Sequence, residues 1–192
     1  MPAPERPATD ETPGHRAVEN LIARYAELVD DGDFPALGVL LADAVLTGSG
    51  APVRGREAIE RMLRQTVVLY ADGTPRTQHV TTNLAVEVDE RAGTALARSY
   101  VTVLQALPGH PLRAIAAGRY HDRFERRDGR WRFTCRRVRI TLVGDVSRHL
   151  RRGPVPGRAP AGGQGAARWW SSLVRASRRA ARVVTPSLGK AR

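Results

Sequence analysis

The first third of the chain places apolar residues at the spacing of an α-helix. In residues 16–30 they recur every three or four positions, which predicts an amphipathic helix that Gly32 ends. The same spacing predicts a short helix in residues 33–41 and a third helix from 57 to about 69. Each of these helices would turn one apolar face toward a core.

After Thr74 and Pro75 the apolar residues follow the period of a β-strand. Strands are predicted around residues 79–88 and in residues 94–104, 114–126 and 130–143. The pair Asp128-Gly129 between the last two is typical of a tight hairpin. Helices followed by an antiparallel meander predict an α+β fold, in which the helices cover one face of a curled sheet.

The charge of the chain divides it into two parts. Residues 1–146 hold twenty arginines and nineteen acids, whereas residues 147–192 hold ten arginines, one lysine and no acid, so the tail supplies nearly all of the net charge of +12. We therefore predict a disordered N-terminus (1–11), a domain (12–146), a Pro/Gly-rich linker (147–165) and a basic tail (166–192).

The basic tail contains adjacent tryptophans, Trp169 and Trp170, among its arginines. This composition suits a conditional amphipathic helix on an anionic membrane surface, an arm on nucleic acid, or a disordered extension that binds nothing. The chain has no apolar signal region and no apolar run long enough to span a membrane, so we expect a cytoplasmic protein, peripheral to a membrane if the tail binds lipid.

Five segments, taken in order, carry a family resemblance. They are residues 21–34 (LIARYAELVDDGDF), 55–59 (GREAI), 79–83 (HVTTN), 118–122 (GRYHD) and 128–133 (DGRWRF). Together they resemble the SnoaL-like branch of the nuclear transport factor 2 (NTF2)-like superfamily over about 130 residues. The resemblance implies a cone-shaped fold with N-terminal helices on a curled antiparallel sheet. Scytalone dehydratase, bile-acid dehydratases, steroid isomerases, polyketide cyclases and many non-catalytic domains share this fold.

Three residues are the candidate catalytic group. Tyr25 lies on the apolar face of the first helix, Asp30 lies in its last turn, where the helix dipole disfavours an anion, and His79 opens a strand. Taken singly, they also fit a core tyrosine, a solvated turn and a structural histidine. The resemblance implies that they converge in a pocket, as the corresponding residues do in the dehydratases.

Three further residues are predicted to bind substrate. Tyr120 occupies a position that contacts substrate in scytalone dehydratase, and it is expected inside the pocket while His121 is exposed, unless a β-bulge exchanges the two faces. Asn83 shares the strand face of His79. Tyr100 lies on the neighbouring strand, where the resemblance would place a second histidine and this chain has none.

The function expected from this set is a cofactor-independent lyase, isomerase or cyclase acting on a small hydrophobic carbonyl compound. The alternative is a non-catalytic ligand-binding or assembly domain. No spacing of histidines or cysteines predicts a metal site. A homodimer is expected through the outer sheet face, because Val80, Leu84, Val86 and Val88 would otherwise form an exposed apolar patch.

Overall fold

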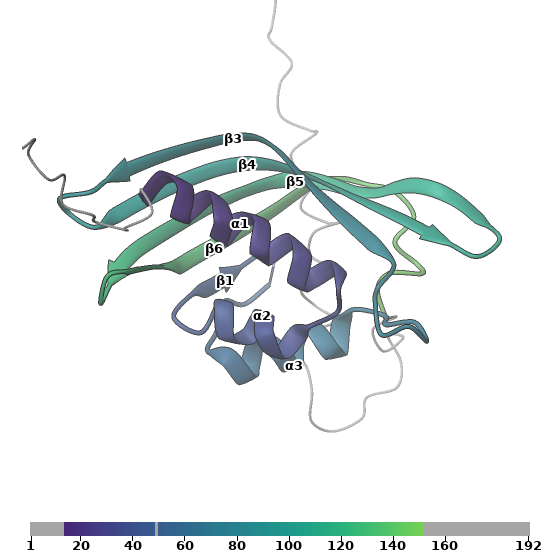
Figure 1. Cartoon of the computed structure of the whole chain (residues 1–192). Helices are drawn as coiled ribbons and strands as arrows, with labels where there is room; N and C mark the ends of the chain where they lie inside the picture. The colour runs from purple at the N-terminus through teal and green to yellow at the C-terminus, as the bar shows by residue number, and fades with distance from the viewer. Residues whose placement is uncertain (1–13, 49, 152–192) are drawn as a thin grey trace, which may run out of the picture.

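Residues 14–48 and 50–151 are described by a computed structural model, in which helices and strands form two layers (Figure 1). The strands form one sheet in the order β2-β1-β6-β5-β4-β3, and neighbours are antiparallel except for β1 and β6. Helices on one side of this curled sheet confirm the predicted α+β cone. The elements are α1 (Gly14–Asp30), α2 (Phe34–Leu40), β1 (Val45–Thr47), β2 (Val53–Arg54), α3 (Arg56–Thr66), β3 (Thr77–Asp89), β4 (Thr94–Leu107), β5 (His110–Arg127) and β6 (Arg130–Val143).

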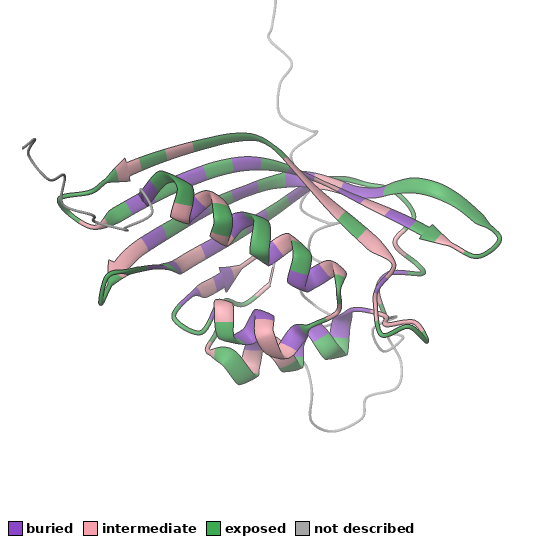
Figure 2. Ribbon diagram, in the orientation of Figure 1, coloured by how far each residue is buried: buried purple, intermediate pink, exposed green. Residues whose placement is uncertain are grey.

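The core lies between the helices and the concave face of the sheet. Figure 2 shows buried and exposed residues alternating along β4 and β5, as a sheet with one covered face requires. On the helix side, Val18 and Ile22 of α1 and Phe34 and Leu37 of α2 are buried. The side chain of Asp33 caps α2 by accepting the backbone N–H of Ala36, which fixes the turn after α1.

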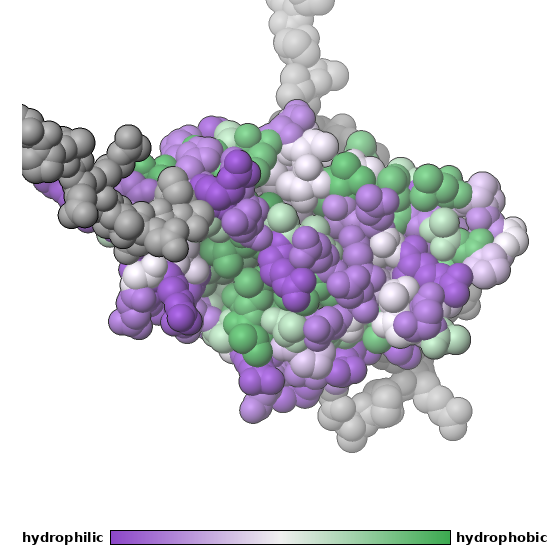
Figure 3. All heavy atoms as spheres, in the orientation of Figure 1, coloured by the Kyte–Doolittle hydropathy of each residue, from purple (hydrophilic) through white to green (hydrophobic). Residues whose placement is uncertain are grey.

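The face that carries the helices is mixed in character. Figure 3 shows hydrophobic side chains gathered beside α1 and α2, within a largely hydrophilic surface. Among the described residues, no helix is long and apolar enough to cross a membrane.

The third helix is shorter than predicted, and the chain after β6 explains why. Val67 already has an extended backbone and pairs with Leu150 as an isolated bridge. The backbone N–H of Val68 donates to the carbonyl of His149, and that of Arg151 donates to Thr66. Residues up to Arg151, which include the start of the expected linker at 147, therefore fold against the end of α3. The remainder of the predicted linker and the basic tail lie outside the described residues, as does the predicted disordered N-terminus.

A β-bulge in β3 removes most of the apolar patch that the sequence predicted. The register with β4 shifts between Thr82 and Ala85, and Asn83 adopts a positive φ of 51° at the bulge. Beyond this point the two strand faces exchange, so Val86 and Val88 pack against the core instead of facing outward. Leu84 stays exposed. The apolar patch that motivated the homodimer is thus largely absent.

The outer face of the sheet is basic instead. Exposed side chains lie in two adjacent rows across β4, β5 and β6: Tyr100, Arg119 and Arg139 in one row, and Arg98, His121 and Arg137 in the next. In a two-fold dimer through this face, like charges would oppose one another, which is unfavourable. The homodimer remains a prediction, and the basic charge of the outer face does not favour that face as the contact surface.

Candidate active site

Asp30 and His79 form a hydrogen-bonded pair inside the cone. Oδ1 of Asp30 lies 2.6 Å from Nδ1 of the His79 ring, and Oδ2 accepts the backbone N–H of His79 at 2.6 Å. The hydroxyl of Thr77 donates to Oδ1 at 2.8 Å. Because an ionised carboxylate only accepts, Nδ1 carries the proton in this contact, and Nε2 is left as a basic nitrogen.

The pair forms because the end of α1 lies against the start of β3. Asp30 is the last residue of α1, and Thr77 and His79 belong to the first residues of β3. Burial opposes ionisation of the Asp30 carboxyl, but the hydrogen bonds from His79 and Thr77 outweigh burial and lower its pKa. Asp30 is therefore a carboxylate near neutral pH, in spite of its unfavourable place at a helix C-terminus.

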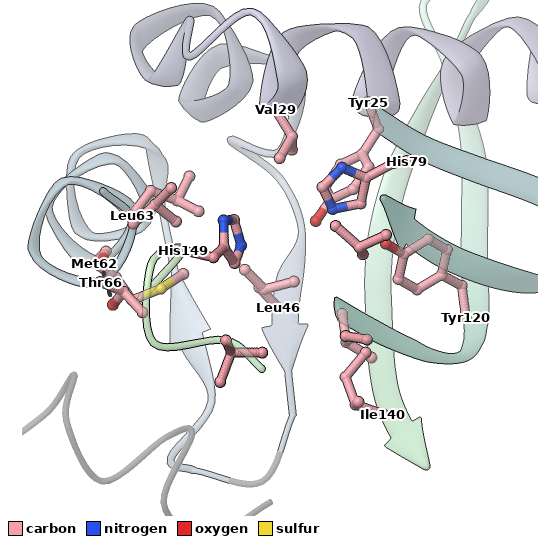
Figure 4. A pocket seen from close by; sticks show the side chains of 15 residues that line it. Tyr25, Val29, Leu46, Met62, Leu63, Thr66, His79, Tyr120, Ile140 and His149 are labelled. Atoms are coloured by element: carbon pink, nitrogen blue, oxygen red, sulfur yellow. Dashed lines mark hydrogen bonds between the residues drawn. The ribbon is translucent and has the colours of Figure 1, made fainter. Parts of the chain in front are cut away.

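Two tyrosines lie beside this pair. The rings of Tyr25 on α1 and Tyr120 on β5 meet edge to face, with centroids 5.9 Å apart. Their hydroxyl groups point into the same space as the His79 ring (Figure 4). Burial is the main cause that raises the pKa of both phenols, and the neighbouring Arg136 only partly offsets it. Both tyrosines are thus protonated hydrogen-bond donors at neutral pH.

A buried ion pair packs against the rings of the two tyrosines. The guanidinium of Arg136 donates to both carboxylate oxygens of Asp122, at 2.9 and 2.7 Å. Its central carbon lies 3.8 Å from the ring centroid of Tyr25 and 4.2 Å from that of Tyr120, which is cation–π geometry. Although burial disfavours its charge, Asp122 raises the pKa of Arg136, so the guanidinium that contacts both rings stays charged.

These side chains surround a small cavity of about 60 Å³. Its walls are mainly apolar, with a few polar groups converging on it, which is typical of a site for a small organic molecule. Among the described residues, no three histidine, cysteine or acidic side chains gather in a way that could hold a metal ion. The lining comprises Tyr25, Val29, Leu46, Met62, Leu63, Thr66, Val67, His79, Val103, Ala116, Tyr120, Val138, Ile140, Val146 and His149.

The structure brings four of the six predicted site residues together. Tyr25, His79 and Tyr120 line the cavity, and Asp30 binds His79 from outside it. The other two lie elsewhere. Tyr100 points outward and is 43% exposed beneath the guanidinium of Arg119, and Asn83 is exposed at the bulge of β3. Strand alternation places Tyr100 on the outer face, and the bulge removes Asn83 from the face of His79.

Two features of the site were missed in the sequence. His149 lies in the segment assigned to the linker, and only the contacts of that segment with α3 place it in the cavity wall. The Asp122–Arg136 pair was missed because the partners lie on different strands. One signal was available: Asp122 shares its strand face with Tyr120 and Phe124, and a buried acid requires a partner of opposite charge.

Comparisons with known proteins agree with this geometry. A family model described as the SnoaL-like domain matches residues 10–137. Among curated proteins, none matches the chain. A protein of unknown function from Mycobacterium tuberculosis is similar in structure, with 27% identity, a TM-score of 0.57, and 91% of this chain and 94% of that one covered.

Two structures from Novosphingobium aromaticivorans are also similar. An NTF2-like protein with a cystatin-like fold has 29% identity and a TM-score of 0.54, covering 65% of this chain and 79% of that one. A protein with the provisional name scytalone dehydratase has 24% identity and a TM-score of 0.53, covering 77% and 95%. The latter likeness shows the fold alone. With the family model matched over most of its length, the chain belongs to the SnoaL-like family of the NTF2-like superfamily.

Proposed function

We propose that the chain is a cofactor-independent lyase, isomerase or cyclase that removes a proton next to the carbonyl group of a small hydrophobic compound. The observation that carries this proposal is the 2.6 Å contact between Asp30 and Nδ1 of His79. It orients the ring so that Nε2 is the nitrogen offered to a ligand, and a carboxylate on the far side stabilises the imidazolium that forms.

The reaction would begin with proton transfer from the carbon next to the carbonyl to Nε2 of His79. The electron pair of the broken C–H bond moves toward the carbonyl oxygen and forms an enolate. Tyr25 and Tyr120 donate hydrogen bonds to that oxygen, where negative charge develops. The imidazolium then returns its proton in one of two ways. In a β,γ-unsaturated compound the enolate is a dienolate and takes the proton at its γ-carbon, which moves the double bond and is isomerisation. In a β-hydroxy compound the electrons of the enolate form the α,β double bond while the C–O bond breaks, and the β-hydroxyl takes the proton and leaves as water.

A non-catalytic ligand-binding domain is the second candidate. The mainly apolar walls of the cavity support it, because such walls suit the binding of a small apolar compound. The two candidates differ in one respect. An enzyme needs the base His79, whereas a binder depends on the cavity as a whole.

Proton exchange in heavy water separates the two candidates. We would incubate the full chain with small cyclic ketones and follow deuterium incorporation next to the carbonyl by proton NMR. His79→Gln should slow this exchange by roughly 100-fold or more. His121→Gln is the matched control, because His121 is exposed on the outer sheet face. If no ketone exchanges faster with the wild-type chain than with His79→Gln, the result contradicts the enzyme proposal. The ligand-binding domain is then the remaining candidate.

A further inference from the structure

A second histidine faces the cavity from the side opposite His79. Figure 4 shows His149 next to Leu63 and Met62 of α3, while His79 and the two tyrosines lie across the cavity on the sheet side. His149 is 6% exposed. The two histidines therefore present polar groups to opposite ends of one small, otherwise mainly apolar space.

The backbone holds His149 in this place. Its carbonyl accepts the N–H of Val68 at 2.9 Å, and its own N–H donates to the carbonyl of Val146 at 3.1 Å. Two residues later, the backbone N–H of Arg151 donates to the carbonyl of Thr66, and the Arg151 side chain donates to that of Val67. The ring is thus fixed in the wall by main-chain contacts on both sides.

One ring nitrogen of His149 has no hydrogen-bond partner among the described residues. This nitrogen, Nδ1, is fully buried. Burial, together with the smaller effect of the nearby His79, lowers the pKa of His149 to about 4, although Asp30 partly offsets the two. The imidazole is therefore neutral near pH 7, with one nitrogen that accepts and one that donates. A buried polar group without a partner is costly, so a ligand that displaces the atoms covering Nδ1 and supplies the partner gains affinity.

We propose that His149 is a ligand-binding residue that hydrogen-bonds a hydroxyl group on the end of the ligand remote from His79, so that the cavity selects neutral hydroxy-carbonyl compounds. The claim that the ligand carries a carbonyl group at the His79 end rests on the proposed function. The claim that it carries a hydroxyl group at the other end rests on His149 alone. A charged ligand group is a poor match here, because the ring of His149 is neutral and its surroundings are apolar.

Two ketones of equal size test this inference. 4-Hydroxycyclohexanone carries the required hydroxyl, and 4-methylcyclohexanone replaces it with a methyl group. Titrations of the full chain followed by protein NMR should give a dissociation constant roughly three- to tenfold lower for the hydroxy compound. His149→Phe should abolish this preference. His121→Phe, a change at an exposed histidine, should retain it.

A measurement on the wild-type chain covers the case in which His149→Phe does not fold. The ring nitrogen signals of His149 should shift on addition of the hydroxy compound and not on addition of the methyl compound. Equal affinity for the two ketones, or a preference that survives His149→Phe, would overturn the inference. Either result leaves proton exchange at His79 untouched, and loss of exchange leaves the hydroxyl preference untouched, so the two proposals fail separately.

Discussion

Asp30 binds His79 through both of its carboxylate oxygens. One oxygen accepts the backbone N–H of His79 and the other contacts the ring at Nδ1, each at 2.6 Å. The same carboxylate therefore fixes both the main chain of β3 and the orientation of the imidazole. A single substitution at Asp30 should accordingly affect stability and reactivity together.

Replacing Asp30 by asparagine should destabilise the chain by about 1–3 kcal/mol at pH 7, because a buried charge-assisted contact is lost. The pKa of Asp30 is lowered in the folded state from its ordinary value of 3.8. Its contribution is therefore complete above pH 3.8 and disappears as the pH falls through the lower folded value. Urea unfolding of wild type and Asp30→Asn should show a difference at pH 5 that shrinks in stronger acid. A difference that persists below the folded pKa of Asp30 would contradict the assignment.

Removing one partner of the Arg136–Asp122 pair should destabilise the chain more than removing both partners. Arg136→Met leaves the Asp122 carboxylate buried without a counter-charge, which should cost about 3–5 kcal/mol. Replacing both residues, with Asp122→Leu added, should restore much of that loss. A double-mutant cycle by urea unfolding measures the coupling. Additive losses would show that the two side chains act independently.

The end of the folded domain should lie at or beyond Arg151. A chain of residues 1–151 should melt at the wild-type temperature, whereas one ending at Val146 should melt several degrees lower, because it loses the contacts of His149, Leu150 and Arg151 with the end of α3. Calorimetry on both truncated chains measures this. Equal melting temperatures would support the expected linker boundary at 147.

Affinity for anionic surfaces should belong to the basic tail. Residues 152–192 hold eight arginines and one lysine without an acid, so the full chain should co-sediment with anionic vesicles at low salt and release them at high salt, while residues 1–151 should not bind. Binding retained by residues 1–151 would assign it to the basic outer sheet face instead. Binding of nucleic acid but not of vesicles would identify the tail as a nucleic-acid arm.

The sequence predicted the elements well because their patterns are local. Helical spacing in α1 and strand alternation in β4 to β6 come from which side of each element faces the core. Asp30 and His79 could be paired only through the family resemblance, since 49 positions separate them along the chain.

The predictions that failed depend on an irregularity within a strand or on contacts between residues far apart in the chain. One inserted residue at the bulge near Asn83 exchanges the faces of β3, and this reversed the placement of Val86 and Val88. His149 follows a polar, turn-rich stretch whose pairing with α3 has no local signal. Tyr100 was misplaced by analogy, although the alternation of its own strand puts it outside.

The protonation state of the His79 ring tests the central claim most directly. Nitrogen NMR of the full chain at neutral pH, with the histidines assigned, should show the proton on Nδ1 and a free lone pair on Nε2. In Asp30→Asn this preference should weaken, because an amide no longer accepts as a carboxylate does. A proton found mainly on Nε2 in the wild-type chain would contradict the account, because His79 could not then accept a proton from a ligand in the cavity.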